Sequence, residues 1–145
     1  MNNILLIEDD AKKVKDISSF ISEKYKNVNL VVEKSFRGGL KQIYDNEFDL
    51  LLIDMTIPKW GDNISGESIE YESFGGFNIM KEMKRKKRII PSIMITMFNE
   101  FGVEDSFISL ESIDNLCKSN FEFYKGLVYY TSKNEEWMSN LEDLL

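Results

Sequence analysis

The chain alternates short, wholly apolar segments with longer segments in which apolar residues recur every three or four positions. The short segments predict buried strands, and the longer ones predict amphipathic helices. The predicted strands cover residues 4–7, 30–32, 50–55, 89–97 and 127–130, and the predicted helices cover residues 11–21, 36–44, 77–83, 103–116 and 137–145. Asp10 stands at the N-cap position of the first helix. Helices that connect consecutive buried strands indicate a parallel sheet with both faces covered.

Five such units predict an α/β fold, a flavodoxin-like doubly wound sheet of five parallel strands in the order 2-1-3-4-5 with helices on both faces. A length of 145 residues fits one domain, so residues 1–145 are expected to form a single unit. The segment 59–76, which carries glycines among polar residues, predicts an irregular excursion. Ligands of this fold bind at the carboxyl ends of the strands.

Charge and composition narrow the classes of function. The net charge is −7, from 25 acidic and 18 basic side chains, which argues against direct DNA binding because DNA binding needs a positive surface. The chain has no histidine, and this excludes Ser-His-Asp catalysis and His-ligated zinc. A single cysteine, Cys117, and the lack of any visible targeting or membrane-spanning segment predict a cytoplasmic protein.

Polar side chains follow three of the predicted strands. Glu8, Asp9 and Asp10 end the first strand, Asp54 ends the third and Thr96 ends the fourth. Each has an ordinary structural explanation: a helix cap, a turn residue or a hydroxyl at a strand end. Because the carboxyl ends of parallel strands meet at one edge, the combination favours a site with clustered carboxylates. An all-oxygen cluster of this kind suits Mg2+.

Four segments resemble the receiver domains of two-component response regulators. Residues 4–10 resemble the first strand with its acidic residues, and residues 48–58 resemble the phosphoacceptor strand with a proline four positions beyond the acceptor. Residues 91–96 resemble the strand that ends in the switch hydroxyl. Residues 130–133 are similar to the segment with the switch aromatic and the phosphate-binding lysine. The resemblance covers the whole chain in order.

The resemblance implies a phosphorelay function and assigns a role to each site residue. Asp54 would be the phosphoacceptor, Thr96 and Lys133 would contact the phosphoryl oxygens, and Thr96 and Tyr130 would form the switch. Mg2+ would be held by Glu8, Asp9, Asp54 and the backbone carbonyl of Thr56. Metal and lysine would offset the charge of the transferred group.

The sequence also departs from the family's pattern. Asn134 replaces the proline that usually follows the lysine, and Met97 replaces a small residue after the switch hydroxyl. Two insertions are expected, at residues 59–76 and 99–126. The glycine-alanine pair before the fifth strand is absent, so Lys133 has an alternative interpretation as a solvent-facing residue.

The leading hypothesis is a stand-alone receiver that is no enzyme beyond its own phosphorylation and dephosphorylation. A sensor histidine kinase or a histidine phosphotransfer protein would donate the phosphoryl group, and an unknown downstream protein would receive the signal. The oligomeric state is left open, with a homodimer as one option. The first alternative is a degenerate, receiver-like interaction module that is not phosphorylated. The second is a Mg2+-dependent phosphohydrolase, which is disfavoured because Thr56 stands where a leaving-group acid is needed.

Overall fold

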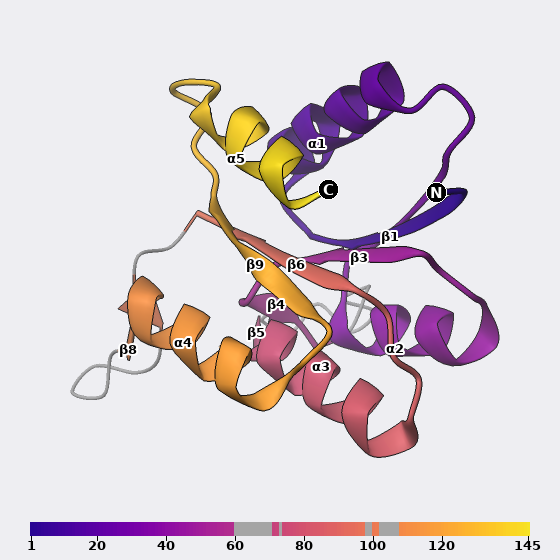
Figure 1. Cartoon of the computed structure of the whole chain (residues 1–145), viewed down its shortest axis with the longest axis vertical. Coiled ribbons are helices and arrows are strands. Elements are labelled where there is room, and N and C mark those ends of the chain that lie inside the picture. Colours follow the sequence, from indigo (N-terminus) through magenta and orange to yellow (C-terminus); the bar gives the residue numbers. More distant parts are fainter. Residues whose placement is uncertain (60–70, 73, 98–99, 102–107) are drawn as a thin grey trace, which may run out of the picture.

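The computed structural model describes residues 1–59, 71–72, 74–97, 100–101 and 108–145. Its centre is a sheet of five parallel strands, β1 (Asn3–Ile7), β2 (Asn29–Glu33), β3 (Leu50–Ile53), β6 (Ser92–Thr96) and β9 (Tyr124–Tyr129). The strands lie in the order β2-β1-β3-β6-β9 (Figure 1). When only the strands of this sheet are numbered in chain order, leaving out the short strands of the two small sheets, the order is 2-1-3-4-5. The predicted fold class is therefore confirmed.

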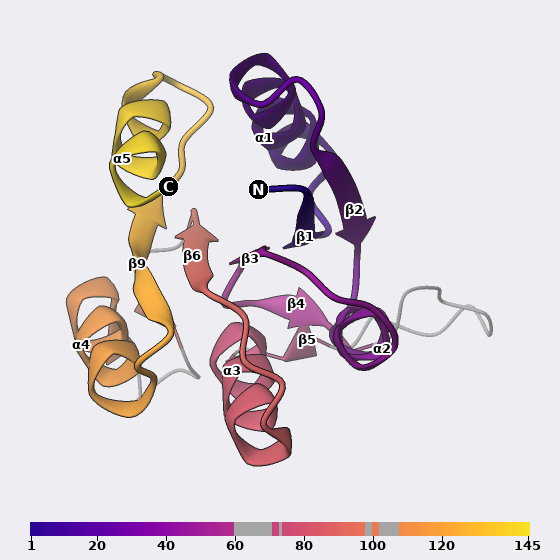
Figure 2. The ribbon, with the colours of Figure 1, turned by 45° about the vertical axis from the view of Figure 1, so that its right-hand side comes forward.

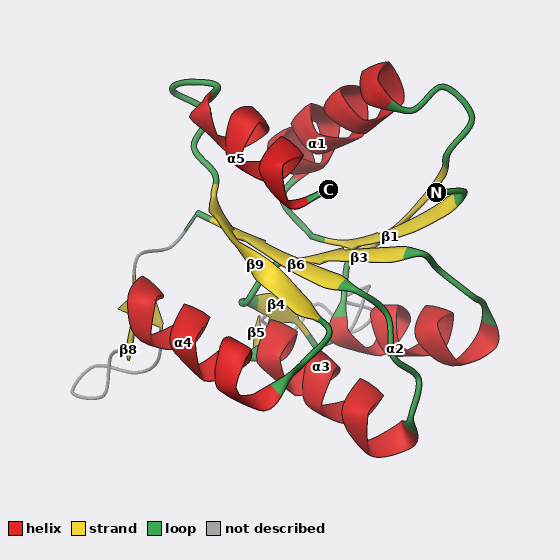
Figure 3. Ribbon diagram, in the orientation of Figure 1, coloured by secondary structure: helices red, strands yellow, loops and turns green. Residues whose placement is uncertain are grey.

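Five helices cover the two faces of this sheet. Helices α1 (Ala11–Lys24) and α5 (Glu136–Leu144) lie on one face, and α2 (Phe36–Asp45), α3 (Gly75–Lys86) and α4 (Leu110–Asn120) lie on the other (Figure 3). The view in Figure 2 shows the same two layers on either side of the strands. The first helix begins as predicted, because the Asp10 side chain accepts a hydrogen bond from the Lys13 amide at 2.9 Å.

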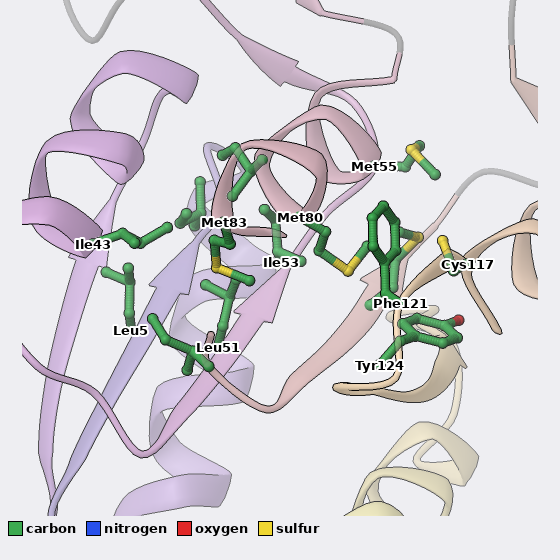
Figure 4. Close-up of a cluster of buried hydrophobic side chains, with 14 of the residues drawn as sticks. Leu5, Ile43, Leu51, Ile53, Met55, Met80, Met83, Cys117, Phe121 and Tyr124 are labelled. Carbon is green, nitrogen blue, oxygen red and sulfur yellow. The ribbon is translucent and has the colours of Figure 1, made fainter. Parts of the chain in front are cut away.

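Each face of the sheet has its own apolar core. Toward α1 and α5, Ile17, Ile21, Trp137 and Leu141 pack on the sheet with less than 3% of each side chain exposed. Toward the other three helices the core is rich in methionine, and Met80 and Met83 of α3 belong to the same buried cluster as Cys117 and Phe121 (Figure 4). These two cores fix the strands from both sides, so the strand ends that carry the polar residues have a rigid base.

Two short antiparallel pairs extend the predicted fold. Strand β4 (Ile57–Pro58) pairs with β5 (Tyr71–Glu72), and β7 (Glu100–Phe101) pairs with β8 (Ile108–Ser109). Both pairs fall in the segments that the sequence marks as insertions, 59–76 and 99–126, or at their borders. Residues 60–70, 73, 98–99 and 102–107 of these segments lie outside the described part of the chain.

Several predicted boundaries differ from the structure. Strand β6 begins at Ser92 and not at residue 89, and β3 ends at Ile53 and not at residue 55. Helix α4 begins at Leu110 and not at residue 103, because the Ser109 side chain caps it by accepting from the Ser112 amide at 3.2 Å. Helix α3 begins two residues earlier than predicted, at Gly75. Strand β9 begins three residues earlier than predicted, at Tyr124, and its register shifts where Gly126 takes a φ of 152° that only glycine adopts readily.

In the described ranges, no helix has the length and apolarity needed to cross a bilayer.

Candidate functional site

The carboxyl ends of β1, β3 and β6 meet at one edge of the sheet, as the sequence predicts. Ile7 and Ile53 are paired in register, so the residues that follow them, Glu8 and Asp54, lie on neighbouring strand ends. The amide of Asp54 donates to the carbonyl of Ile7 at 3.2 Å and continues this pairing. Thr96 ends β6 beside them and is fully buried.

A lysine that was not among the predicted site residues lies at the centre of this edge. The Lys13 side chain, from the first turn of α1, has no exposed surface. Its ammonium contacts the Oε1 atom of Glu8 and lies 3.1 Å from the Oδ2 atom of Asp54. It also donates to the backbone carbonyl of Ile95, in β6, at 2.7 Å. Lys13 therefore joins the ends of three strands through one positive charge.

Glu8 is held by backbone amides on the side away from Lys13. Its Oε2 atom accepts from the amides of Asp9 and Asp10 at 3.0 and 3.2 Å. Burial and the nearby charge of Asp54 raise the pKa of Glu8 to about 8, although Lys13 and the amide of Asp10 act in the opposite direction. Burial and the charge of Asp54 therefore favour the protonated form of Glu8, which reduces the negative charge that faces Lys13.

Asp54 is enclosed, with 2% of its surface exposed. Its Oδ1 atom accepts from the amide of Met55 at 2.7 Å, and its Oδ2 atom faces Lys13. Both carboxylate oxygens are thus engaged within the protein. A carboxylate that attacks a phosphoryl group needs a free oxygen and room for in-line approach.

The residues present do not fit a Mg2+ ion. In the part of the chain that the structure describes, no three acidic, cysteine or histidine side chains come together as a metal-binding group. The space between Glu8 and Asp54 holds the ammonium of Lys13 instead. The expected metal set of Glu8, Asp9, Asp54 and Thr56 therefore does not surround an open cation position, since the Lys13 ammonium lies between Glu8 and Asp54. Asp9 and Thr56 are half-buried at the same edge.

The two residues of the predicted switch lie on opposite faces of the sheet. Alternate residues of a strand point to opposite faces. Ile95 packs toward α1 and α5, so Thr96 faces α3 and α4. Tyr130 is buried toward α1 and α5, where its hydroxyl donates to the Oδ2 atom of Asp16 at 2.6 Å. The aromatic residue paired in register with Thr96 is Tyr129, which is 39% exposed.

Lys133 lies in the turn between β9 and α5, with an exposed side chain. Its backbone amide donates to the Thr131 hydroxyl at 3.2 Å. The cation that reaches Asp54 comes from Lys13, on the first helix, so the solvent-facing interpretation describes Lys133 in this structure. A positive charge is present beside Asp54, but it comes from a different element of the fold.

The signal for Lys13 was present in the sequence. Residues 13, 17 and 21 are four positions apart and form the buried row of α1, in which Lys13 is the only polar member. The apolar residues of the predicted helix 11–21, namely Val14, Ile17, Phe20 and Ile21, predict a stripe that leaves Lys13 just outside it. A buried row that begins with a lysine, in a helix that directly follows the acidic residues 8–10, indicates an internal ion pair.

Gly76 fixes the first turn of α3 against the backbone of Asp54. A Cβ atom at this position would lie 2.5 Å from the Asp54 carbonyl oxygen and 3.1 Å from the Cα atom of Met55. The Gly76 amide donates to the carbonyl of Met55 at 2.9 Å. Gly76→Ala is expected to lower the free energy of unfolding by about 1–3 kcal/mol, because either the first turn of α3 or the end of β3 must shift to make room for the new Cβ atom. Urea unfolding measures this loss.

Gly38→Ala is the matched control. A Cβ atom there would also approach another atom at 2.5 Å, but that atom is the Oε2 end of the flexible Glu33 side chain and not backbone; the next atom, the Ser35 hydroxyl oxygen, would lie 3.0 Å away. A glycine replaced by alanine inside a helix gains about 0.5–1 kcal/mol, so Gly38→Ala should be neutral or stabilising. Equal losses in the two variants would show that the Asp54 backbone is not a rigid contact of α3.

No protein-family model matches the chain. Among curated proteins, the uncharacterized protein y4jR of Sinorhizobium fredii is 25% identical over 141 residues, which are 96% of this chain and 93% of that protein. The similarity extends over nearly the full length of both proteins.

Several solved structures with a similar fold are response regulators or their receiver domains. The chemotaxis response regulator CheY4 of Vibrio cholerae is 16% identical, with a TM-score of 0.65 over 100% of this chain and 99% of that chain. The phosphorylated cyanobacterial phytochrome response regulator RcpA is 12% identical, with a TM-score of 0.65 over 99% and 90%. The response regulator TrrA of Thermotoga maritima, in complex with Mg2+ and BeF, is 16% identical, with a TM-score of 0.58 over 100% of both chains. The chain has the CheY-like receiver fold.

Proposed function

We propose that this chain, with its receiver fold, is a signalling module that acts through a protein partner and takes no phosphoryl group on Asp54. The observation that carries this proposal is the closed state of Asp54. Its side chain is 2% exposed, one oxygen accepts from the Met55 amide, and the other faces the ammonium of Lys13. Such a carboxylate is a member of an internal ion cluster, and this is the role we assign to it.

The surface for a protein partner is expected beside Thr96. Tyr129 is 39% exposed on β9, and Leu116 is 41% exposed on the neighbouring helix α4. Helix α4 and strand β9 are in contact in the fold. Large apolar side chains of this exposure are candidates for partner contact, since aromatic residues contribute strongly to binding at protein interfaces.

Phosphorylation of Asp54 is the second candidate function. The positions of Glu8, Asp54 and Thr96 at adjacent strand ends favour it, because this arrangement places two carboxyl groups and a hydroxyl at one edge. In that case a sensor histidine kinase or a histidine phosphotransfer protein would be the donor. The ion pair with Lys13 would have to open before Asp54 could react.

Intact-mass measurement after incubation with acetyl phosphate and Mg2+ separates the two candidates. We expect the mass of the wild-type chain to stay unchanged under conditions that phosphorylate a functional receiver domain treated in parallel. An adduct on the wild type that is absent from Asp54→Asn would reject our proposal and establish the second candidate. An equal adduct on both proteins would place the modification at a residue other than Asp54, which would reject the second candidate and agree with our proposal.

A further inference from the structure

The environment of the Lys13 ammonium has the chemistry of a cation site. Three oxygen atoms surround it: a carboxylate oxygen of Glu8, a carboxylate oxygen of Asp54 and the carbonyl oxygen of Ile95. The ammonium donates a hydrogen bond to the Ile95 carbonyl and forms ion pairs with the two carboxylates. The site is also sealed, since Lys13 is 0%, Glu8 1% and Asp54 2% exposed.

The ammonium and a divalent cation exclude each other at this place. A Mg2+ ion binds carboxylate oxygens at about 2.1 Å. An ion on the Oδ2 atom of Asp54 would therefore lie beside an ammonium that is itself 3.1 Å from the same oxygen. Two cations at such a distance in a buried setting repel strongly. One occupant must leave before the other can enter.

We propose that Lys13 is a built-in replacement for the divalent cation of this edge, which holds the three strand ends in one arrangement independently of Mg2+. Lys13 differs from a bound ion because its ammonium is covalently attached to α1. It cannot dissociate from the protein, and its effective concentration does not vary. The proposal depends on the receiver arrangement of strands but not on whether Asp54 is phosphorylated.

The same lysine also connects the edge to the face between α1 and α5. Its Nζ atom lies 5.9 Å from the centre of the Tyr130 ring, within range of a cation–π interaction. Tyr130 packs against Trp137 with ring centres 5.4 Å apart. Loss of the ammonium is therefore expected to be sensed by Trp137, whose fluorescence can be followed in a Trp60→Phe background.

Removal of the ammonium tests the proposal with Mg2+ alone as the probe. The wild type and Lys13→Met are titrated with Mg2+ at constant ionic strength, and binding is followed by calorimetry and by Trp137 fluorescence. The wild type should give no saturable response. Lys13→Met should gain Mg2+ affinity by at least about tenfold, because Glu8 and Asp54 lose their fixed counter-charge and carboxylate oxygens are ligands that Mg2+ prefers.

Two further variants test whether Asp54 supplies the new Mg2+ affinity. The double variant Lys13→Met, Asp54→Asn should not show the higher Mg2+ affinity of Lys13→Met. Lys15→Met, the same substitution at an exposed position of α1, should behave like the wild type. Lys13→Gln serves as a second neutral variant if Lys13→Met is unfolded, and refolding of either variant by Mg2+ would also support the proposal. Saturable Mg2+ binding by the wild type through Asp54, or no gain in either neutral variant, would overturn it. Neither result depends on the outcome of the phosphodonor experiment.

Discussion

Lys13→Met is expected to lower the free energy of unfolding by about 3–5 kcal/mol in the absence of Mg2+, because it removes one partner of a buried ion cluster. Lys13 is fully buried, so solvent does not screen its charge. Without the ammonium, Asp54 and Glu8 lie close together with no positive charge between them. The variant must either bury an uncompensated charge or bind further protons, and both cost free energy. Urea unfolding at pH 7 measures the loss.

Two controls separate the charge from the side chain. Lys15→Met removes an exposed lysine from the same helix and should change the free energy of unfolding by less than about 0.5 kcal/mol. In a background with Glu8→Gln and Asp54→Asn, Lys13→Met should cost far less than in the wild type, since both carboxylates are already neutral. A cost that is the same in both backgrounds would mean that Lys13 acts by packing alone.

The sheet and its polar edge were predictable for a clear physical reason. Segments 4–7 and 50–53 are short and wholly apolar, as two-sided burial requires, and acidic residues follow both at once. In a parallel sheet the residues after such strands must meet at one edge. Local sequence patterns alone therefore predicted that Glu8 and Asp54 lie on neighbouring strand ends.

The identity of the cation was not predictable in the same way. Lys133 follows a strand and matches a family spacing, whereas Lys13 lies in a helix whose burial depends on how α1 packs over the sheet. Tyr129 and Tyr130 illustrate the same limit, because one residue of register decides which face each side chain takes. The bulge at Gly126 sets that register. Long-range packing thus determines the chemistry that local sequence leaves open.

The pH dependence of stability is the second large effect that we expect. Burial and the charge of Asp54 raise the pKa of Glu8 in the folded chain from 4.5 to about 8. Between these two values the unfolded chain has released the proton that the folded chain retains. The unfolded state therefore binds fewer protons, and the free energy of unfolding should fall as the pH rises, by about 1.4 kcal/mol per pH unit from this group. The contribution of Glu8 is complete below about pH 4.5 and is lost by about pH 8.

Urea unfolding at several pH values from 5 to 8 isolates this contribution when the wild type is compared with Glu8→Gln. The carboxyl groups of Asp16, Asp49 and Glu82 have pKa values lowered by their hydrogen bonds, so they stay ionised in the folded chain in this range. They add slope only near pH 5, where the unfolded chain still binds some protons, and that slope has the opposite sign. The wild type should lose stability toward pH 8, and Glu8→Gln should remove that slope. Glu23→Gln, at an exposed site of α1, should keep it. Parallel pH profiles for the wild type and Glu8→Gln would show that Glu8 is ionised throughout, and that Lys13 then faces two negative charges instead of one.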